Sequence, residues 1–225
     1  MAFGTEKVEE EIASLFPSAK VERLDFDTAR TRTAYERIIS DFEKGKTQIL
    51  IGTQMLSKGL DFGNVSVVGI LNADNLMNYP DFRAHERAFQ LMVQVSGRAG
   101  RRDKRGTVVL QTSQPEHPLI RMVQHFAYKE MVRLQLSERS MFRYPPYYRL
   151  IVLVLRSRNE SVLQELSVIY AEKLHARLGE RVLGPVTPPV TRVQTLHIKK
   201  IVLKIEIAAA IAPVREILEA VHSEM

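Results

Sequence analysis

The chain has 225 residues, of which 45% are hydrophobic and 26% charged, a composition typical of folded globular proteins and not of disordered ones. No apolar run reaches the roughly 18 residues of a membrane span, and the N-terminal residues lack the basic and apolar regions of a signal peptide. We therefore expect a cytoplasmic protein without a membrane partner. The absence of cysteine excludes disulfides, thiolate catalysis and cysteine zinc sites within these residues.

Lys and Arg outnumber Asp and Glu by 32 to 26, which gives a formal charge of +6, and the excess is concentrated in three stretches. Residues 83–106 contain seven basic and two acidic side chains. Residues 139–158 contain five arginines and residues 192–204 four cations, in both cases without an acid. Clustered cations favour a polyphosphate partner, either a nucleotide or a nucleic acid. A solvated basic surface without a partner is the alternative.

The first half of the chain alternates between helical and strand patterns. Apolar residues spaced three and four apart predict helices, at residues 8–16, 35–42 and 81–96. Short runs rich in β-branched residues predict strands, at residues 20–24, 48–51, 65–71 and 107–111. The alternation predicts an α/β fold in which helices cover both faces of a parallel sheet, with the last three strands buried on both faces.

The second half has a different pattern. It predicts one long helix over residues 119–140 and then a rigid Pro-Pro segment flanked by aromatic residues at 143–148. Further strands and helices are expected at residues 150–156, 161–178, 181–183, 198–207 and 212–223. We therefore expect an α/β domain over residues 1–116, a connecting helix over 117–141 and a small α+β domain over 142–225.

A polar segment at residues 52–62 directly follows a predicted strand. Close approach of a ligand to the backbone is allowed by Gly52 and Gly59. Donors to phosphate are offered by Thr53, Ser57 and Lys58. Asp61 offers an acceptor to a ribose hydroxyl or to an arginine. The alternative is an ordinary polar loop that leads into a helix.

A second segment at residues 94–101 contains Gln94, Gly97, Arg98 and Arg101. If the preceding helix continues, the two arginines project from the same side, because they are three residues apart. Two guanidinium groups aimed at one point suit a γ-phosphate, and the alternative is a pair of surface salt bridges. We expect both segments at the carboxyl ends of strands, where ligands bind in open α/β sheets.

In this order the two segments resemble motifs V and VI of the superfamily 2 helicases. The matching residues are Thr53, Gly59 and Asp61 for motif V, and Gln94, Gly97, Arg98 and Arg101 for motif VI. The stretches GTQMLSKGLDF, PDFRAHERAFQLMVQVSGRAGR and RYPPYYRL are similar to those of the primosomal replication-restart helicases. The similarity extends over nearly the whole chain and is weaker after residue 157.

The resemblance implies a RecA-like parallel sheet, the second lobe of a helicase, followed by a small α+β C-terminal domain. It implies an ATP-driven DNA helicase that moves 3′ to 5′ and remodels stalled replication forks so that a primosome assembles. Arg98 and Arg101 then reach the triphosphate. Gly59, Asp61, Gln94 and Gly97 then lie on the nucleotide side, and Thr53, Gln54 and Lys58 on the DNA side.

The resemblance also implies ATP with Mg²⁺ as cofactor, and single-stranded and branched DNA and replication-restart and primosome proteins as partners. The chain has no Gly-x-x-x-x-Gly-Lys-Ser/Thr loop and no Asp-Glu-x-His box, which in this family lie on the first lobe. The family's zinc-binding cysteines are absent as well, so we expect no metal site here. We therefore expect a C-terminal fragment that is inactive by itself.

Several alternatives stay open from the sequence. One alternative is a lobe of another superfamily 2 motor, such as an RNA helicase. Another is a DNA-binding module without catalysis. The aromatic residues at 143–148 either pack one domain against another or stack on unpaired bases. Lys200 and Lys204 share one face of a strand, which forms either a solvated edge or a DNA track. Asp74 follows a strand, and its role is open.

Overall fold

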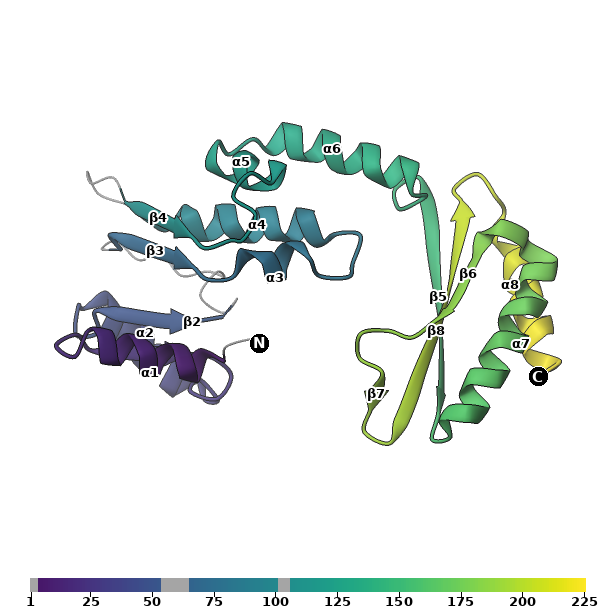
Figure 1. The fold of residues 1–225 in the computed structure, drawn as a ribbon, viewed down its shortest axis with the longest axis horizontal. Coiled ribbons are helices and arrows are strands. Elements are labelled where there is room, and N and C mark those ends of the chain that lie inside the picture. The colour runs from purple at the N-terminus through teal and green to yellow at the C-terminus, as the bar shows by residue number, and fades with distance from the viewer. Residues whose placement is uncertain (1–3, 54–64, 101–105) are drawn as a thin grey trace. The chain divides into compact units, whose positions relative to one another are not determined.

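The computed structural model describes residues 4–53, 65–100 and 106–225, and these form two compact units (Figure 1). The first unit consists of the described residues up to Tyr79 and of Arg83–Met131. The second consists of Pro80–Phe82 and Val132–Met225. None of the helices in the described ranges is long and apolar enough to cross a membrane.

The N-terminal part of the first unit is built around two parallel strands. Strand β1 (Val21–Leu24) pairs with β2 (Ile49–Gly52), and helices α1 (Thr5–Leu15) and α2 (Arg32–Glu43) pack against them. Helix α2 begins at Thr31, whose side-chain oxygen accepts the N–H of Ala34 over 3.2 Å, as is usual for a helix N-cap. Its buried face presents Ile38 and Ile39 to Leu24, which together form a small core.

A second parallel pair follows in the same unit. Strand β3 (Val67–Ile70) pairs with β4 (Thr107–Leu110), and helices α3 (Ala73–Met77) and α4 (Ala84–Ser96) connect them. Helix α4 buries the side of its surface on which apolar residues recur at intervals of three and four, namely Ala84, Ala88, Phe89 and Met92. The α/β character and the parallel pairing that the sequence predicts are therefore confirmed.

The burial of these strands differs from the prediction. The described strands of the first unit form two separate two-stranded ladders, and β3 alternates between exposed and half-buried residues. Val67 is 61% exposed and Val109 is 56% exposed. Because side chains along a strand alternate between the two faces, this pattern shows that only one face of β3 is covered by the described helices. The prediction that these strands are buried on both faces is therefore wrong for β3 and β4.

The helix predicted over residues 119–140 is in fact two helices, α5 (Pro118–Gln124) and α6 (Tyr128–Met141). They are separated at Phe126, whose φ of 51° lies in the left-handed region. The N–H of Ala127 donates to the carbonyl of Met122 over 2.8 Å, and that of Phe126 to Val123 over 3.2 Å, which is a Schellman helix end. Glycine usually takes the left-handed position of this motif, so Phe126 gives no sequence signal for the break.

The second unit contains an antiparallel sheet with the strand order β5-β8-β6. These strands are β5 (Tyr148–Ser157), β6 (Val182–Val186) and β8 (Leu196–Glu206), and a short strand β7 (Arg192–Val193) also pairs with β8. Helices α7 (Glu160–Leu178) and α8 (Ile211–Ser223) cover one face of the sheet (Figure 1).

The core of the second unit lies between these helices and the sheet. Its fully buried members come from α7, β8 and α8, and they are Leu174, Ile201, Leu203, Ile205 and Val221. Because Ile201, Leu203 and Ile205 point into this core, the alternation along β8 places Lys200 and Lys204 on the opposite face, as the sequence predicts. The elements of this α+β unit lie close to the predicted ranges.

Candidate functional site

The segment predicted to approach a phosphate begins where α4 ends. The N–H of Gly97 donates to the carbonyl of Val93 over 3.0 Å and closes the helix. The N–H of Arg98 then donates to Val95 over 3.0 Å, which makes a tighter turn with a spacing of three residues. Arg98 therefore lies in a turn beyond the helix. The condition under which the two arginines would project from one side, a helix that continues, is not met at Arg98. Arg101 lies outside the described residues.

This turn lies at the amino end of β3. The N–H of Gly100 donates to the carbonyl of Val65 over 3.1 Å, two residues before β3 begins. Val65 in turn packs against the core of Leu24, Ile38 and Ile39. The predicted position at the carboxyl end of a strand is therefore wrong for this segment. The chain leaves β3 at its carboxyl end and returns through α4, so the end of α4 reaches the opposite edge.

Two glycines near this turn have different surroundings. Gly97 is exposed, and a Cβ atom built there would lie 3.5 Å from the carbonyl oxygen of Val93, an ordinary contact. At Gly106 a Cβ atom would lie 2.4 Å from the backbone nitrogen of Gly100 and 2.5 Å from the carbonyl carbon of Ala99. The folding of the chain therefore requires glycine at 106, whereas nothing in its own packing requires glycine at 97.

The other predicted segment begins at the carboxyl end of β2, as expected. Thr53 directly follows this strand and its side chain is exposed. The other predicted residues of the segment lie outside the described residues, and they are Gln54, Lys58, Gly59 and Asp61.

Asp74, whose role the sequence left open, joins the carboxyl ends of β3 and β4. Its Oδ1 accepts the hydroxyl of Thr112 over 2.6 Å, and its Oδ2 accepts the N–H and the hydroxyl of Ser113, each over 2.8 Å. These three hydrogen bonds lower the pKa of Asp74. Because both carboxylate oxygens are engaged, Asp74 ties the first turn of α3 to the segment that follows β4. Its partners are almost 40 residues away, so no local pattern indicated this contact.

The aromatic segment at 143–148 is held by a stack within the second unit. The ring of Tyr144 lies parallel to that of Phe82, with 4.7 Å between the centroids and 7° between the planes. The Lys204 ammonium lies 3.8 Å from the centroid of Tyr144, and the Arg139 guanidinium lies 5.1 Å from that of Phe82. Tyr144 is therefore packed against a residue of its own unit. Packing of one domain against another and stacking on unpaired bases both stay predictions for this segment.

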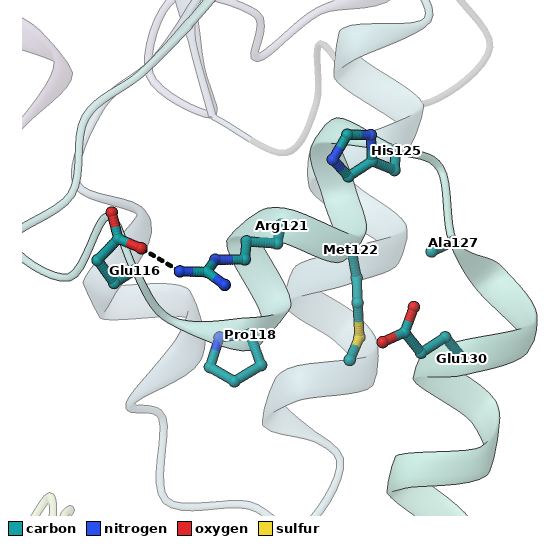
Figure 2. Close-up of a pocket in the computed structure, with 7 residues that line it drawn as sticks. All are labelled: Glu116, Pro118, Arg121, Met122, His125, Ala127 and Glu130. Atoms are coloured by element: carbon teal, nitrogen blue, oxygen red, sulfur yellow. Dashed lines mark hydrogen bonds and ion pairs between the residues drawn. The ribbon is translucent and has the colours of Figure 1, made fainter.

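A small pocket of about 320 Å³ lies over α5 and the start of α6 (Figure 2). The side chains of Glu116 and Arg121 form an ion pair at one side, and Met122 and Glu130 line the other (Figure 2). None of the predicted site residues lines this pocket. In the part of the chain that the structure describes, no group of three or more His, Asp or Glu side chains is arranged to hold a metal ion.

Two protein families match this chain one after the other. Residues 2–103 match the helicase conserved C-terminal domain, and residues 140–224 match the primosomal protein N C-terminal domain. Replication restart protein PriA of Bacillus subtilis (strain 168) is 40% identical over 203 residues, which are 89% of this chain and 25% of that protein.

Other relatives give the same result. The PriA protein of a Synechocystis species is 39% identical over 194 residues, which cover 84% of this chain and 23% of the relative. That of Haemophilus influenzae is 38% identical over 193 residues, which cover 84% of this chain and 26% of the relative. The chain thus spans about a quarter of the length of the curated relatives it matches.

Proposed function

This chain belongs to the family of replication restart protein PriA, and we propose that it supplies the second, RecA-like lobe and the C-terminal domain of an ATP-dependent DNA helicase. The observation that carries the proposal is the order of the two family matches, a helicase domain followed by a primosomal domain. The helicase moves 3′ to 5′ at stalled forks in the cytoplasm, where it meets replication-restart and primosome proteins.

The nucleotide side of this function rests on the turn after α4. Arg98 and Arg101 donate to the γ-phosphate of ATP, where a guanidinium stabilises the charge that develops during phosphoryl transfer. Gln94, Gly59 and Asp61 also contact the nucleotide. The exposure of Gly97 supports this role, because only backbone carbonyl oxygens, and no side chain, lie close to the position of a Cβ atom there. A first lobe supplies the phosphate loop and the carboxylates that hold Mg²⁺.

The DNA side rests on the segment after β2. Thr53, Gln54 and Lys58 contact the phosphates of a single strand, and the exposure of Thr53 at the end of β2 supports this position. Residues 139–158 and 192–204, which carry nine cations and no acid, add phosphate contacts from the second unit. Branched forks are bound through these contacts.

A chimera tests the proposal. In it, this chain replaces the matching 203 residues of the Bacillus subtilis relative. We expect ATP hydrolysis that single-stranded DNA stimulates. A chimera that is folded by circular dichroism, and binds ATP and DNA, but hydrolyses no ATP would contradict the proposed role of the motif VI arginines. A chimera that binds no DNA would contradict the role of the DNA side.

A further inference from the structure

Two aromatic side chains stay exposed at the junction of α6 and β5, before and after the half-buried Tyr144 of the stack. Phe142 is 57% exposed and Tyr147 is 43% exposed, although both belong to the same short segment as the packed Tyr144. Large aromatic side chains usually bury much of their surface when they serve the fold. The stack of Tyr144 on Phe82 therefore explains only one of the aromatic residues in this segment.

The backbone around these two residues is fixed in place. The N–H of Tyr144 donates to the carbonyl of Arg139 over 2.7 Å and ends α6 in a Schellman motif. The N–H of Tyr147 donates to the carbonyl of Tyr144 over 3.1 Å. Arg143 takes the left-handed position of the motif with a φ of 58°, which is unfavourable for a side chain with a Cβ atom. The segment thus presents Phe142 and Tyr147 from a rigid support.

Two cations, Lys204 and Arg143, lie at the turn that carries Phe142. Lys204 donates to the carbonyl of Phe142 over 2.6 Å, and burial together with the charge of Arg143 lowers the pKa of Lys204. Two cations therefore repel each other beside this turn. Residues 139–158 contain no acid, and the nearby Glu206 is already paired with Arg181 over 2.8 Å. The local field therefore suits a polyanion.

We propose that Phe142 and Tyr147 form a base-stacking site for single-stranded DNA and that Arg143 contacts the adjoining phosphate. The inference rests on the proposed function, in that it assigns part of its DNA binding to this segment. Exposed aromatic rings beside cations are the combination by which proteins hold unpaired bases without reading their sequence. The left-handed Arg143 fits this role, because it places a charge where the helix end alone would favour glycine.

Binding of two fluorescent oligonucleotides by the full chain tests the site. One is oligo(dT), and the other has the same length and phosphates but no bases. Phe142→Ala and Tyr147→Ala should each weaken oligo(dT) binding by about 5-fold or more, the effect expected for one stacked base. Binding of the abasic strand should not change. The melting temperature should stay close to that of the wild type, because both side chains are exposed.

Two further variants act as controls. Phe142→Leu keeps an apolar side chain without a π face and should also weaken oligo(dT) binding. Phe16→Ala removes an aromatic residue of similar exposure, 51%, from the acidic N-terminal part and should change neither affinity. Equal losses for both strands, or unchanged oligo(dT) affinity in both alanine variants, would overturn the stacking site alone. A wild-type chain that binds neither strand would instead contradict the DNA binding of the proposed function.

Discussion

Gly97 and Gly106 precede and follow a basic stretch, and only one of them is required by the packing of the chain. The φ and ψ of Gly97, −66° and −5°, are accessible to any residue. The backbone atoms of Gly100 and Ala99, in contrast, leave no room for a Cβ atom at Gly106. A substitution at each position therefore separates a glycine needed for folding from one that the packing of the chain does not require.

We expect Gly97→Ala to unfold at the same temperature as the wild type or slightly higher, because alanine restricts the unfolded chain by about 0.4–1 kcal/mol. Gly106→Ala should lower the free energy of unfolding by about 1–3 kcal/mol, since the backbone must move to accommodate the methyl group. Thermal unfolding of both variants measures this difference. A larger loss for Gly97→Ala than for Gly106→Ala would show that Gly97 is a packing residue.

Arg101 gives the sharpest test of the catalytic assignment. In the chimera, Arg101→Ala should lower ATP turnover by about 10³-fold or more while DNA affinity stays nearly unchanged, as for an arginine finger. Arg101→Lys should restore little, because an ammonium lacks the planar fork of donors. The control is Arg32→Ala, which removes an exposed pair with Glu36 and should change stability by about 0–1 kcal/mol and turnover not at all. Near-normal turnover of Arg101→Ala would refute the assignment.

Asp25 gives a prediction for acid stability. Burial raises the pKa of this carboxyl, but hydrogen bonds from Thr5, Thr28 and Asp27 outweigh that effect and lower the pKa to about 2. A group whose pKa falls on folding stabilises the protein above its unfolded pKa, and the contribution is lost as the pH falls through the folded value. We expect Asp25→Asn to lower the free energy of unfolding by about 2 kcal/mol at pH 7.

Urea unfolding between pH 7 and pH 2 measures this effect. The difference between Asp25→Asn and the wild type should shrink below pH 4 and nearly vanish near pH 2, where the wild-type carboxyl also becomes neutral. A difference that stays constant over this range would mean that the charge of Asp25 contributes nothing.

At the scale of the elements, helix ends without glycine explain where the sequence prediction is wrong. Phe126 ends α5 and Arg143 ends α6, each in the left-handed conformation. Glycine or asparagine is the usual signal for such an end. Since residues 119–140 contain neither, their apolar spacing continues through the break between α5 and α6. The spacing of apolar residues predicts which face of a helix is buried, but it does not predict a turn that divides one helix from the next.

Arg143→Gly should therefore raise the free energy of unfolding of the second unit by about 0.5–1 kcal/mol, because glycine takes the left-handed conformation without a steric penalty. Arg143→Ala removes the same charge and keeps the Cβ atom, so it should be less stable than Arg143→Gly by about this amount. Thermal unfolding compares the two variants. If both stabilise the protein equally, the gain comes from the lost repulsion with Lys204 and not from the backbone.

At the scale of the whole molecule, the chain contains the two arginines proposed to act on ATP but no phosphate loop or Mg²⁺-binding acidic box in its 225 residues. An arginine that stabilises charge in the transition state has no effect unless other groups position the phosphate. We expect the purified chain to hydrolyse no ATP above background, with or without single-stranded DNA. A phosphate-release assay measures this, and the chimera serves as the positive control. Steady DNA-stimulated turnover by the chain alone would contradict this expectation.

The sequence by itself determined the family, most helices and strands with their approximate ranges, and the residues proposed for the chemistry. These depend on local information, namely hydrophobic periodicity and the spacing within short motifs such as Gln94-x-x-Gly97-Arg98. Only the tertiary structure decided that the turn at Arg98 lies at the amino end of β3. It also decided that Thr112 and Ser113 donate hydrogen bonds to Asp74, and that Tyr144 stacks on Phe82. Each of these contacts joins residues far apart along the chain, and their geometry depends on how the intervening elements fold, which no local pattern records.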